Sequence, residues 1–176
     1  VQQNEMTVAV ILGEKQDTGA EVQSSGCCVD PRGFLLTTAH QVKSVVNLKA
    51  KFVDGSGCAL KVVRLDVDRE IALLQADKPL PKAAAIGNMG ELRSGSPLIS
   101  IAAPNNLDFS TVTGIVSNTN RMYNGHRVVQ ADLPASPGSS GGPVFDRNGK
   151  IVGVIIGKLK DDGWVTVINP VNIAYD

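Results

Sequence analysis

The sequence has no excess of charge of either sign. Its 176 residues include 17 Lys and Arg against 17 Asp and Glu, which gives a formal net charge of zero. Recognition of nucleic acid or of an anionic membrane surface normally requires a clustered basic face. We therefore expect no nucleic-acid partner and no general electrostatic attraction of the domain to membranes.

Long hydrophobic runs are also missing. The longest apolar stretches, such as Ile151 to Ile156, are far shorter than the roughly 20 residues that a membrane-spanning helix needs. We expect no membrane insertion of this domain. The 43% of hydrophobic residues is still enough to bury the core of one domain, or of one split into two small barrels. No signal peptide is recognised and the pattern continues to the last residues, so we expect an excised or processed domain.

Cysteine is scarce, and its few positions exclude two classes of small protein. The odd set of Cys27, Cys28 and Cys58 does not make a disulfide framework. With no Cys-x-x-Cys pair and only two histidines, the sequence has no zinc signature. Neighbours in a strand point to opposite faces, and we expect these cysteines to be small buried apolar residues. We expect neither a metal nor a cofactor.

Helical spacing is not kept anywhere for the ten or more residues that a stable helix needs. Short β-branched and aliphatic runs, separated by Gly, Asp, Asn and Pro, instead predict strands. Two sets of about six strands predict an all-β fold of two six-stranded antiparallel barrels. The clearest runs are Thr7 to Leu12, Gly33 to Thr38, Val45 to Val53, Ala59 to Leu65 and Ile71 to Leu74, then Leu98 to Ala102, Ser110 to Ser117, Arg127 to Ala131, Lys150 to Ile156 and Trp164 to Ile168.

The predicted division of the chain follows these two sets. An N-terminal barrel covers residues 1–78, a connector rich in Pro and Gly covers 79–96, and a C-terminal barrel covers 97–176. The C-terminal unit is expected to include the start of a helix, with Asn169 as its cap and Pro170 in its first turn.

The strongest chemical signal is the segment Pro137 to Pro143, which reads PGSSGGP. Glycines on both sides of Ser140 allow a tight loop whose backbone N–H groups face a cleft. The amides of Gly138 and Ser140 would form an oxyanion hole, in which each donor is typically worth on the order of 10² to 10³ in rate. Taken alone, the segment could also be a Gly/Ser-rich turn between strands.

Two further segments supply the partners that a nucleophilic serine needs. His40 follows the hydrophobic run that begins at Gly33, so it lies at a strand end, where a base can face a cleft. Glu70 immediately precedes the apolar run from Ile71 and could receive the other imidazole N–H. Each has a plainer interpretation, a satisfied surface histidine and a charged turn, and the combination with Ser140 favours the catalytic one.

Together these segments resemble the trypsin-like serine proteases, and most closely their HtrA or Deg branch. The order His, acid, Ser excludes the arrangements of α/β-hydrolases and subtilisins. The resemblance runs from about Ser25 to Asn169 and includes Ser25-Gly26, Val29 to Thr37, Gly87-Asn88, Leu92 to Gly95, Thr111 to Ser117, Gln130 to Asp132 and Asn148 to Val154.

The resemblance implies a serine endopeptidase that acts through an acyl-enzyme. Ser140 would be the nucleophile, His40 its general base, and Glu70 the orienting acid. Glu70 stands where the family has aspartate, and Asp68 is the alternative acid. When positions are counted from the serine loop as in the family, Ile155 stands where the family has a small polar residue that helps to hold the acid. Glu70 is therefore expected to lack one hydrogen-bond donor.

The same register predicts the substrate pocket. Its floor and wall are assigned to Pro134 and Ala135, and its other side to Ile156, Gly157 and Thr166. None of these is a carboxylate, so cleavage after Arg or Lys is not expected. A small or medium aliphatic P1 residue (the one whose carbonyl is attacked), such as Val, Ala, Ile or Leu, is predicted.

Two alternative functions remain open at this point. Glutamate at position 70 and isoleucine at position 155 differ from the family pattern, and this is compatible with a pseudoprotease that binds peptides or supports assembly. The other alternative is an inert structural β domain. His126 is interpreted as a solvated hairpin histidine rather than a metal ligand with His40. The family implies protein or peptide substrates, a homo-oligomer, and the cell envelope, periplasm or a secretory compartment as location.

Overall fold

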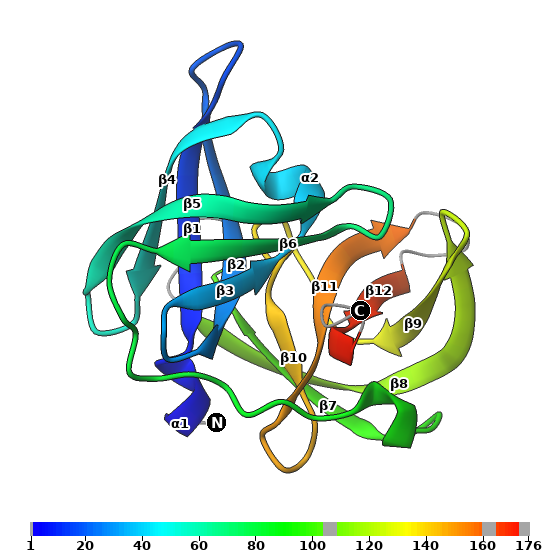
Figure 1. Cartoon of the computed structure of the whole chain (residues 1–176). Coiled ribbons are helices and arrows are strands. Elements are labelled where there is room, and N and C mark those ends of the chain that lie inside the picture. The colour runs from blue at the N-terminus through cyan, green and yellow to red at the C-terminus, as the bar shows by residue number, and fades with distance from the viewer. Residues whose placement is uncertain (1, 104–108, 160–164, 173–176) are drawn as a thin grey trace.

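A computed structural model describes residues 2–103, 109–159 and 165–172 of the chain (Figure 1). Strands dominate it, and the helices are single turns. In chain order the elements are α1 (Gln2–Glu5), β1 (Val8–Lys15), β2 (Glu21–Asp30), β3 (Phe34–Thr37), α2 (Ala39–Val42), β4 (Val45–Phe52), β5 (Gly57–Asp66), β6 (Ile71–Ala76), the 3-10 turn η1 (Met89–Glu91), β7 (Pro97–Ala102), β8 (Ser110–Tyr123), β9 (His126–Asp132), β10 (Pro143–Phe145), β11 (Ile151–Leu159) and β12 (Val165–Pro170).

The strands close into two six-stranded antiparallel barrels, as the sequence predicted. The first has the order β1-β2-β3-β6-β5-β4 and the second β10-β11-β12-β9-β8-β7. Figure 1 shows them side by side, joined by the extended connector that follows β6. Closure leaves no free sheet edge in either barrel. No helix in the described ranges combines the length and apolar character needed to cross a membrane.

Apolar packing forms three main layers. One cluster fills the first barrel around Leu35 and Leu74, and another fills the second around Val144 and Ile155. The third lies between the barrels, and we call it the seam. It combines residues of the first barrel, the connector and the second barrel: Val8, Cys27, Leu36, Ile71, Ala84, Ile101, Phe145, Ile151, Val154 and Val171. Burial of this layer fixes one barrel against the other.

Strand β2 lies in a segment that the sequence analysis did not identify as a strand. Its residues alternate between two apolar environments, with Cys27 in the seam and Cys28 in the first-barrel interior. Both thiols are buried and free, whereas Cys58 is half-buried. Cys27 and Cys28 therefore have the buried apolar roles expected of them, and the seam depends on a strand built largely from small residues.

Burial should control the reactivity of the three thiols. Desolvation raises the pKa of Cys27 to about 12 and that of Cys28 to about 11, so both stay protonated at pH 8. Only the more accessible Cys58 should be alkylated by iodoacetamide in the native protein at that pH, and its own raised pKa should make it slow. Intact-mass measurement should show one addition, and three after denaturation. Two or more additions to native protein would contradict this packing.

Two details of the second barrel bear on earlier expectations. Asn169 and Pro170 are the last residues of β12, so the expected helix does not begin at Asn169. Residues 171–172, the last that the structure describes, adopt a 3-10 conformation. His126 opens β9 directly after a turn in which Asn124 and Gly125 both have positive φ, 47° and 78°. An Asn-Gly pair is the common hairpin turn of this kind, and His126 is half-buried beside it.

Candidate active site

Three short segments carry the predicted catalytic side chains. His40 lies in α2, which follows β3 of the first barrel almost directly. Glu70 ends the turn between β5 and β6, and Ser140 lies in the loop between β9 and β10 of the second barrel. Residues from both barrels must therefore meet across the seam for the site to exist.

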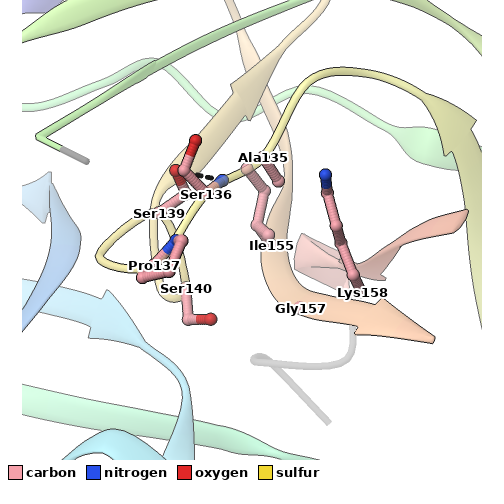
Figure 2. A pocket seen from close by; sticks show the side chains of 8 residues that line it. All are labelled: Ala135, Ser136, Pro137, Ser139, Ser140, Ile155, Gly157 and Lys158. Atoms are coloured by element: carbon pink, nitrogen blue, oxygen red, sulfur yellow. Dashed lines mark hydrogen bonds between the residues drawn. The ribbon is translucent and has the colours of Figure 1, made fainter. Parts of the chain in front are cut away.

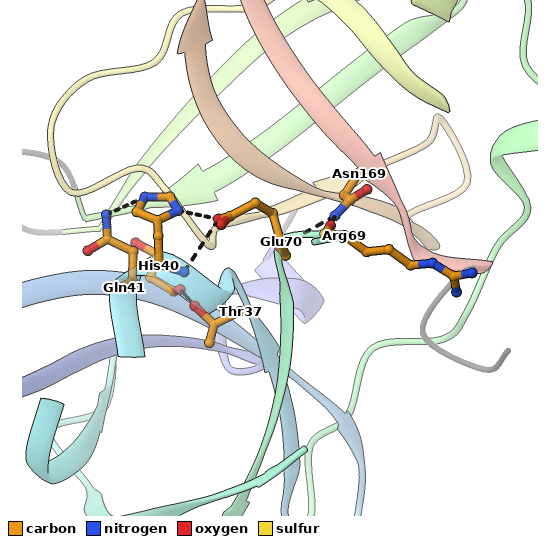
Figure 3. Close-up of polar contacts among 7 residues, drawn as sticks. Thr37, His40, Gln41, Arg69, Glu70 and Asn169 are labelled. Carbon is orange, nitrogen blue, oxygen red and sulfur yellow. Dashed lines mark hydrogen bonds and ion pairs between the residues drawn. The ribbon is translucent and has the colours of Figure 1, made fainter. Parts of the chain in front are cut away.

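His40 and Glu70 are in direct contact (Figure 3). The ring Nδ1 of His40 lies 2.5 Å from Oε2 of Glu70, and the backbone N–H of His40 donates to the same oxygen at 3.4 Å. The Glu70 side chain is only 10% exposed, whereas that of His40 is 43% exposed. A buried carboxylate thus holds the inner edge of the ring, and the outer edge is left to the solvent side.

The backbone of Glu70 explains how a glutamate reaches the ring. Its φ of 57° places it in the left-handed region, which is uncommon for a residue with a long side chain. Its N–H donates to the carbonyl of Val67 at 3.3 Å, closing the turn. Asp68, the alternative acid, is exposed in that turn and makes no contact with His40 in the described structure. Glu70, not Asp68, is the carboxylate that meets the imidazole.

The free ring nitrogen of His40 has a partner that the sequence analysis missed. A carboxylate only accepts hydrogen bonds, so the proton lies on Nδ1 and Nε2 holds a lone pair. The side-chain amide of Gln41 donates to Nε2 at 2.9 Å, as Figure 3 shows. Among the described residues, no hydrogen bond joins His40 to Ser140. The base is oriented, and its reactive nitrogen is covered by an exposed amide.

The serine loop leaves two backbone amides unpaired. The amides of Ser139, Gly141 and Gly142 donate to the carbonyls of Ser136, Ile155 and Ser139. Gly138 and Ser140 donate to no residue that the structure describes. These are the two amides that the sequence assigned to an oxyanion hole. Gly138 has a φ of 93°, a backbone conformation that favours glycine.

Ser25 ties this loop to the first barrel. It is fully buried on β2, and its backbone N–H donates to the carbonyl of Ser140 at 3.0 Å while its Oγ donates to the carbonyl of Gly138 at 2.7 Å. Its own carbonyl accepts from Thr37 Oγ1 at 2.8 Å. A Cβ added at Gly141 would collide with that carbonyl and with Thr37. Ser140 is thereby held beside the end of β3, three residues before His40.

Removing the Ser25 hydroxyl should loosen the oxyanion loop. In Ser25→Ala the Gly138 carbonyl loses its buried donor, and the loop no longer holds the neighbouring amides in one position. We expect kcat on a peptide substrate to fall by about 10- to 100-fold and KM to change little. Ser24→Ala, a buried neighbour on β2 without a bond to the loop, is the matched control. Equal kinetics of the two variants would show that the Ser25 hydroxyl has no such role.

A cavity of about 490 Å³ opens beside the serine loop (Figure 2). Its wall is mostly apolar, and none of its described lining residues is a carboxylate. Lys158, at one side in Figure 2, is the only charged lining residue among those described. The lining residues are Ala135, Ser136, Pro137, Ser139, Ser140, Ile155, Gly157 and Lys158.

This arrangement of His, acid, serine and unpaired amides agrees with comparisons to known proteins. Residues 24–154 match the family described as "Trypsin-like peptidase domain". The chain belongs to the trypsin-like peptidase family. It is 34% identical over 146 residues to the "Probable periplasmic serine endoprotease DegP-like" of Pseudomonas savastanoi pv. phaseolicola, an alignment that covers 80% of this chain and 30% of that protein. It is 34% identical over 142 residues to the "Serine protease Do-like HtrA" of Bacillus subtilis, covering 74% and 32%.

The similarity to these relatives shows that the chain is an HtrA-type member of the trypsin-like peptidases. The chain spans about a third of the length of the two relatives. Among solved structures, "HtrA-type protease AlgW with tripeptide" is similar with a TM-score of 0.91 and 23% identity, over 99% of this chain and 60% of that one. At that identity the likeness concerns the fold, which is the two-barrel fold described above.

Within this peptidase domain, the structure brings only some of the predicted pocket residues together. Ala135 and Gly157 line the cavity. Pro134 is exposed outside it, and Ile156 is buried in a small cluster with Val128 and Val167. Thr166 is also buried, and its hydroxyl donates to the carbonyl of Leu133 at 2.7 Å. Ile156 and Thr166 thus have structural contacts in place of the predicted cavity contacts, and Pro134 is not among the described lining residues.

Ile155 has two environments. It is buried in the second-barrel core and also lines the cavity. Its N–H donates to the carbonyl of Gly142 at 2.9 Å, and its side chain has no donor for Glu70. The described residues contain no group of three His, Cys, Asp or Glu side chains that could hold a metal ion.

Proposed function

We propose that the chain is a serine endopeptidase in which Ser140, His40 and Glu70 form the catalytic triad. The observation that carries this proposal is the pairing of the buried Glu70 carboxylate with Nδ1 of His40, beside a loop in which two amides have no partner among the described residues. The first feature fixes the tautomer that a general base needs, and the second supplies donors for an oxyanion. A β domain without catalytic function would not require an oriented imidazole together with such a loop.

The proposed reaction follows from these positions. Ser140 Oγ attacks the carbonyl carbon of a peptide bond while His40 Nε2 takes the hydroxyl proton. The amides of Gly138 and Ser140 bind the resulting oxyanion. His40 then gives the proton to the leaving amine as the C–N bond breaks, and an acyl-enzyme remains on Ser140. Water, deprotonated by the same nitrogen, hydrolyses that ester and restores the hydroxyl.

Gln41 must release Nε2 before His40 can accept the serine proton. The amide is on the exposed side of the ring, and its contact at 2.9 Å is a neutral hydrogen bond, for which water is an adequate replacement. Rotation of this side chain therefore costs little. The resting arrangement is compatible with an active enzyme whose base is uncovered as substrate binds.

The cavity supports a preference for a small or medium aliphatic P1 residue. Its lining is apolar around Ala135 and Ile155, and its described lining residues include no carboxylate to pair with a basic P1 side chain. Lys158 at its side further disfavours Arg and Lys by like-charge repulsion. Protein or peptide segments with Val, Ala, Ile or Leu at P1 are the proposed substrates.

Cleavage of a peptide library with varied P1 tests this proposal. Val, Ala, Ile and Leu should dominate the P1 position of products identified by mass spectrometry. Ser140→Ala protein prepared in parallel identifies any cleavage that comes from contaminating proteases. A dominant basic or aromatic P1 would overturn the specificity, and equal cleavage by the Ser140→Ala variant would overturn the activity itself.

The pseudoprotease alternative is not favoured. It was motivated by Glu70 and Ile155, yet the Glu70 carboxylate reaches the ring and the serine loop keeps two unpaired amides. Oligomerisation and a location in the cell envelope, periplasm or a secretory compartment stay proposals that rest on the relatives. One of these, in P. savastanoi, is named as probably periplasmic.

A further inference from the structure

The acid Glu70 lies in a turn with an unfavourable backbone conformation. Its left-handed φ of 57° is unfavourable for a residue with a side chain, and such a conformation persists only where its surroundings hold it. Ile155 cannot provide that support, because its side chain is apolar and its backbone N–H is bonded to Gly142. The turn has hydrogen bonds of its own, from the Arg69 N–H to Asp66 Oδ1 at 3.0 Å and from the Glu70 N–H to the carbonyl of Val67, and a contact from the second barrel adds to them.

Asn169 lies on β12, the strand that pairs with the Ile155 strand β11. Ile155 pairs with Ile168 across β11 and β12, and Asn169 is the next residue of β12. Its side chain is buried, with the residue only 1% exposed. Figure 3 shows it reaching from the second barrel to the turn of the first, where its Nδ2 donates to the carbonyl of Arg69 and, at 3.4 Å, to that of Glu70.

The chemistry of the amide matches this position. An asparagine Nδ2 carries two hydrogens, and the turn presents two consecutive carbonyls to it. Both carbonyls belong to the backbone that carries the acid, and about 100 residues separate them from Asn169 in sequence. A buried amide that satisfies two carbonyls of a strained turn fixes that turn relative to the second barrel.

We propose that Asn169 is a positioning residue for the catalytic acid, which it acts on through the Arg69–Glu70 backbone. It holds the left-handed turn so that the Glu70 carboxylate meets His40 Nδ1, in a domain where Ile155 offers no donor. The role rests on the proposed function of Glu70. It also links acid geometry to the docking of the barrels, because the acid lies on one and its support on the other.

Asn169→Leu removes both donors and keeps the branched shape of the side chain. We expect kcat to fall by up to about 100-fold, with KM within about twofold, because the pocket is untouched and the base is misoriented. The proton on His40 Nδ1, which a 2.5 Å hydrogen bond to a carboxylate shifts far downfield in the NMR spectrum, should move upfield or exchange-broaden. Thr7→Val is the control. It removes the hydrogen bonds of another buried side chain, from Thr7 Oγ1 to the carbonyl of Asn4 and from Cys27 Sγ to Thr7 Oγ1, and should change neither kcat nor the proton signal.

A double-mutant cycle with Glu70→Gln separates positioning from general stability. If Asn169 acts through the acid, adding Asn169→Leu to Glu70→Gln should lower kcat by less than about threefold. An equal loss in both backgrounds, or an unchanged proton signal in the single variant, would overturn the proposal. Should Asn169→Leu not fold, Asn169→Ser, which keeps one donor, is measured in the same way and should show an intermediate loss.

The NMR signal of the His40 Nδ1 proton tests the role of Asn169 independently of the proposed peptidase activity. The downfield proton can be followed in Ser140→Ala protein, which is not expected to turn over substrate. Loss of the signal on adding Asn169→Leu to Ser140→Ala supports positioning whatever the activity. A wild-type protein without Ser140-dependent cleavage would refute the endopeptidase, and an unaffected signal would refute only the role of Asn169.

Discussion

Ser140→Ala should abolish peptide hydrolysis, with kcat reduced by about 10⁶-fold. The hydroxyl is the only group proposed to form the acyl bond, and nothing else in the serine loop can replace it. The residual rate should come from the oxyanion amides and substrate binding alone. Steady-state cleavage of a fluorogenic peptide with an aliphatic P1 residue measures the effect.

The neighbouring hydroxyl provides a matched control for this prediction. Ser139 is buried, and its Oγ accepts a hydrogen bond from the amide of Ser136 at 3.2 Å. Ser139→Ala should therefore keep kcat within about tenfold, because it removes a loop contact and no reacting group. If Ser139→Ala were the inactive variant and Ser140→Ala the active one, the assignment of the nucleophile would be wrong.

Glu70→Gln should reduce kcat by about 10⁴-fold. A carboxamide can present an N–H to His40 Nδ1, which favours the tautomer with the proton on Nε2, and that tautomer cannot accept the serine proton. The fold should survive, since the side chain keeps its shape. The same peptide assay, with thermal denaturation to verify folding, tests this expectation.

Two further variants make the Glu70 prediction specific. Asp68→Asn should leave kcat unchanged, because Asp68 is exposed and does not touch His40. Glu70→Asp should lower kcat by about 10²-fold, since the turn is held in place and the shorter carboxylate falls back from the ring. Full activity of Glu70→Gln would mean that another acid orients the imidazole.

Much of this fold could be predicted from sequence, because alternating apolar residues and glycine-rich turns are local signals. Strand β2 could not. Its small polar residues, such as Ser24 and Ser25, do not form an apolar run, and closure of the barrel and the seam makes them part of a strand. Asn169 was assigned to a helix cap for a similar reason. The Asn-Pro pair is a helix-start signal, and pairing with β11 overrides it.

The residues of the candidate site also differ in whether a local sequence pattern reveals them. His40, Glu70 and Ser140 were found because each lies in a motif of adjacent residues. Ser25, Asn169 and the cavity wall act through contacts with segments 99 to 113 residues away, or with the opposite barrel, which no local pattern reveals. Pocket prediction by register was the weakest step. Ile156 and Thr166 are buried in contacts of the second barrel and do not line the cavity.

Covalent labelling with a fluorophosphonate probe tests the central claim most directly, because it reports an activated serine without any assumption about substrate. The account predicts one adduct, mapped to Ser140 by peptide mass spectrometry and strongly reduced in His40→Ala. Absence of labelling in well-folded protein, or labelling that persists unchanged in Ser140→Ala, would contradict it.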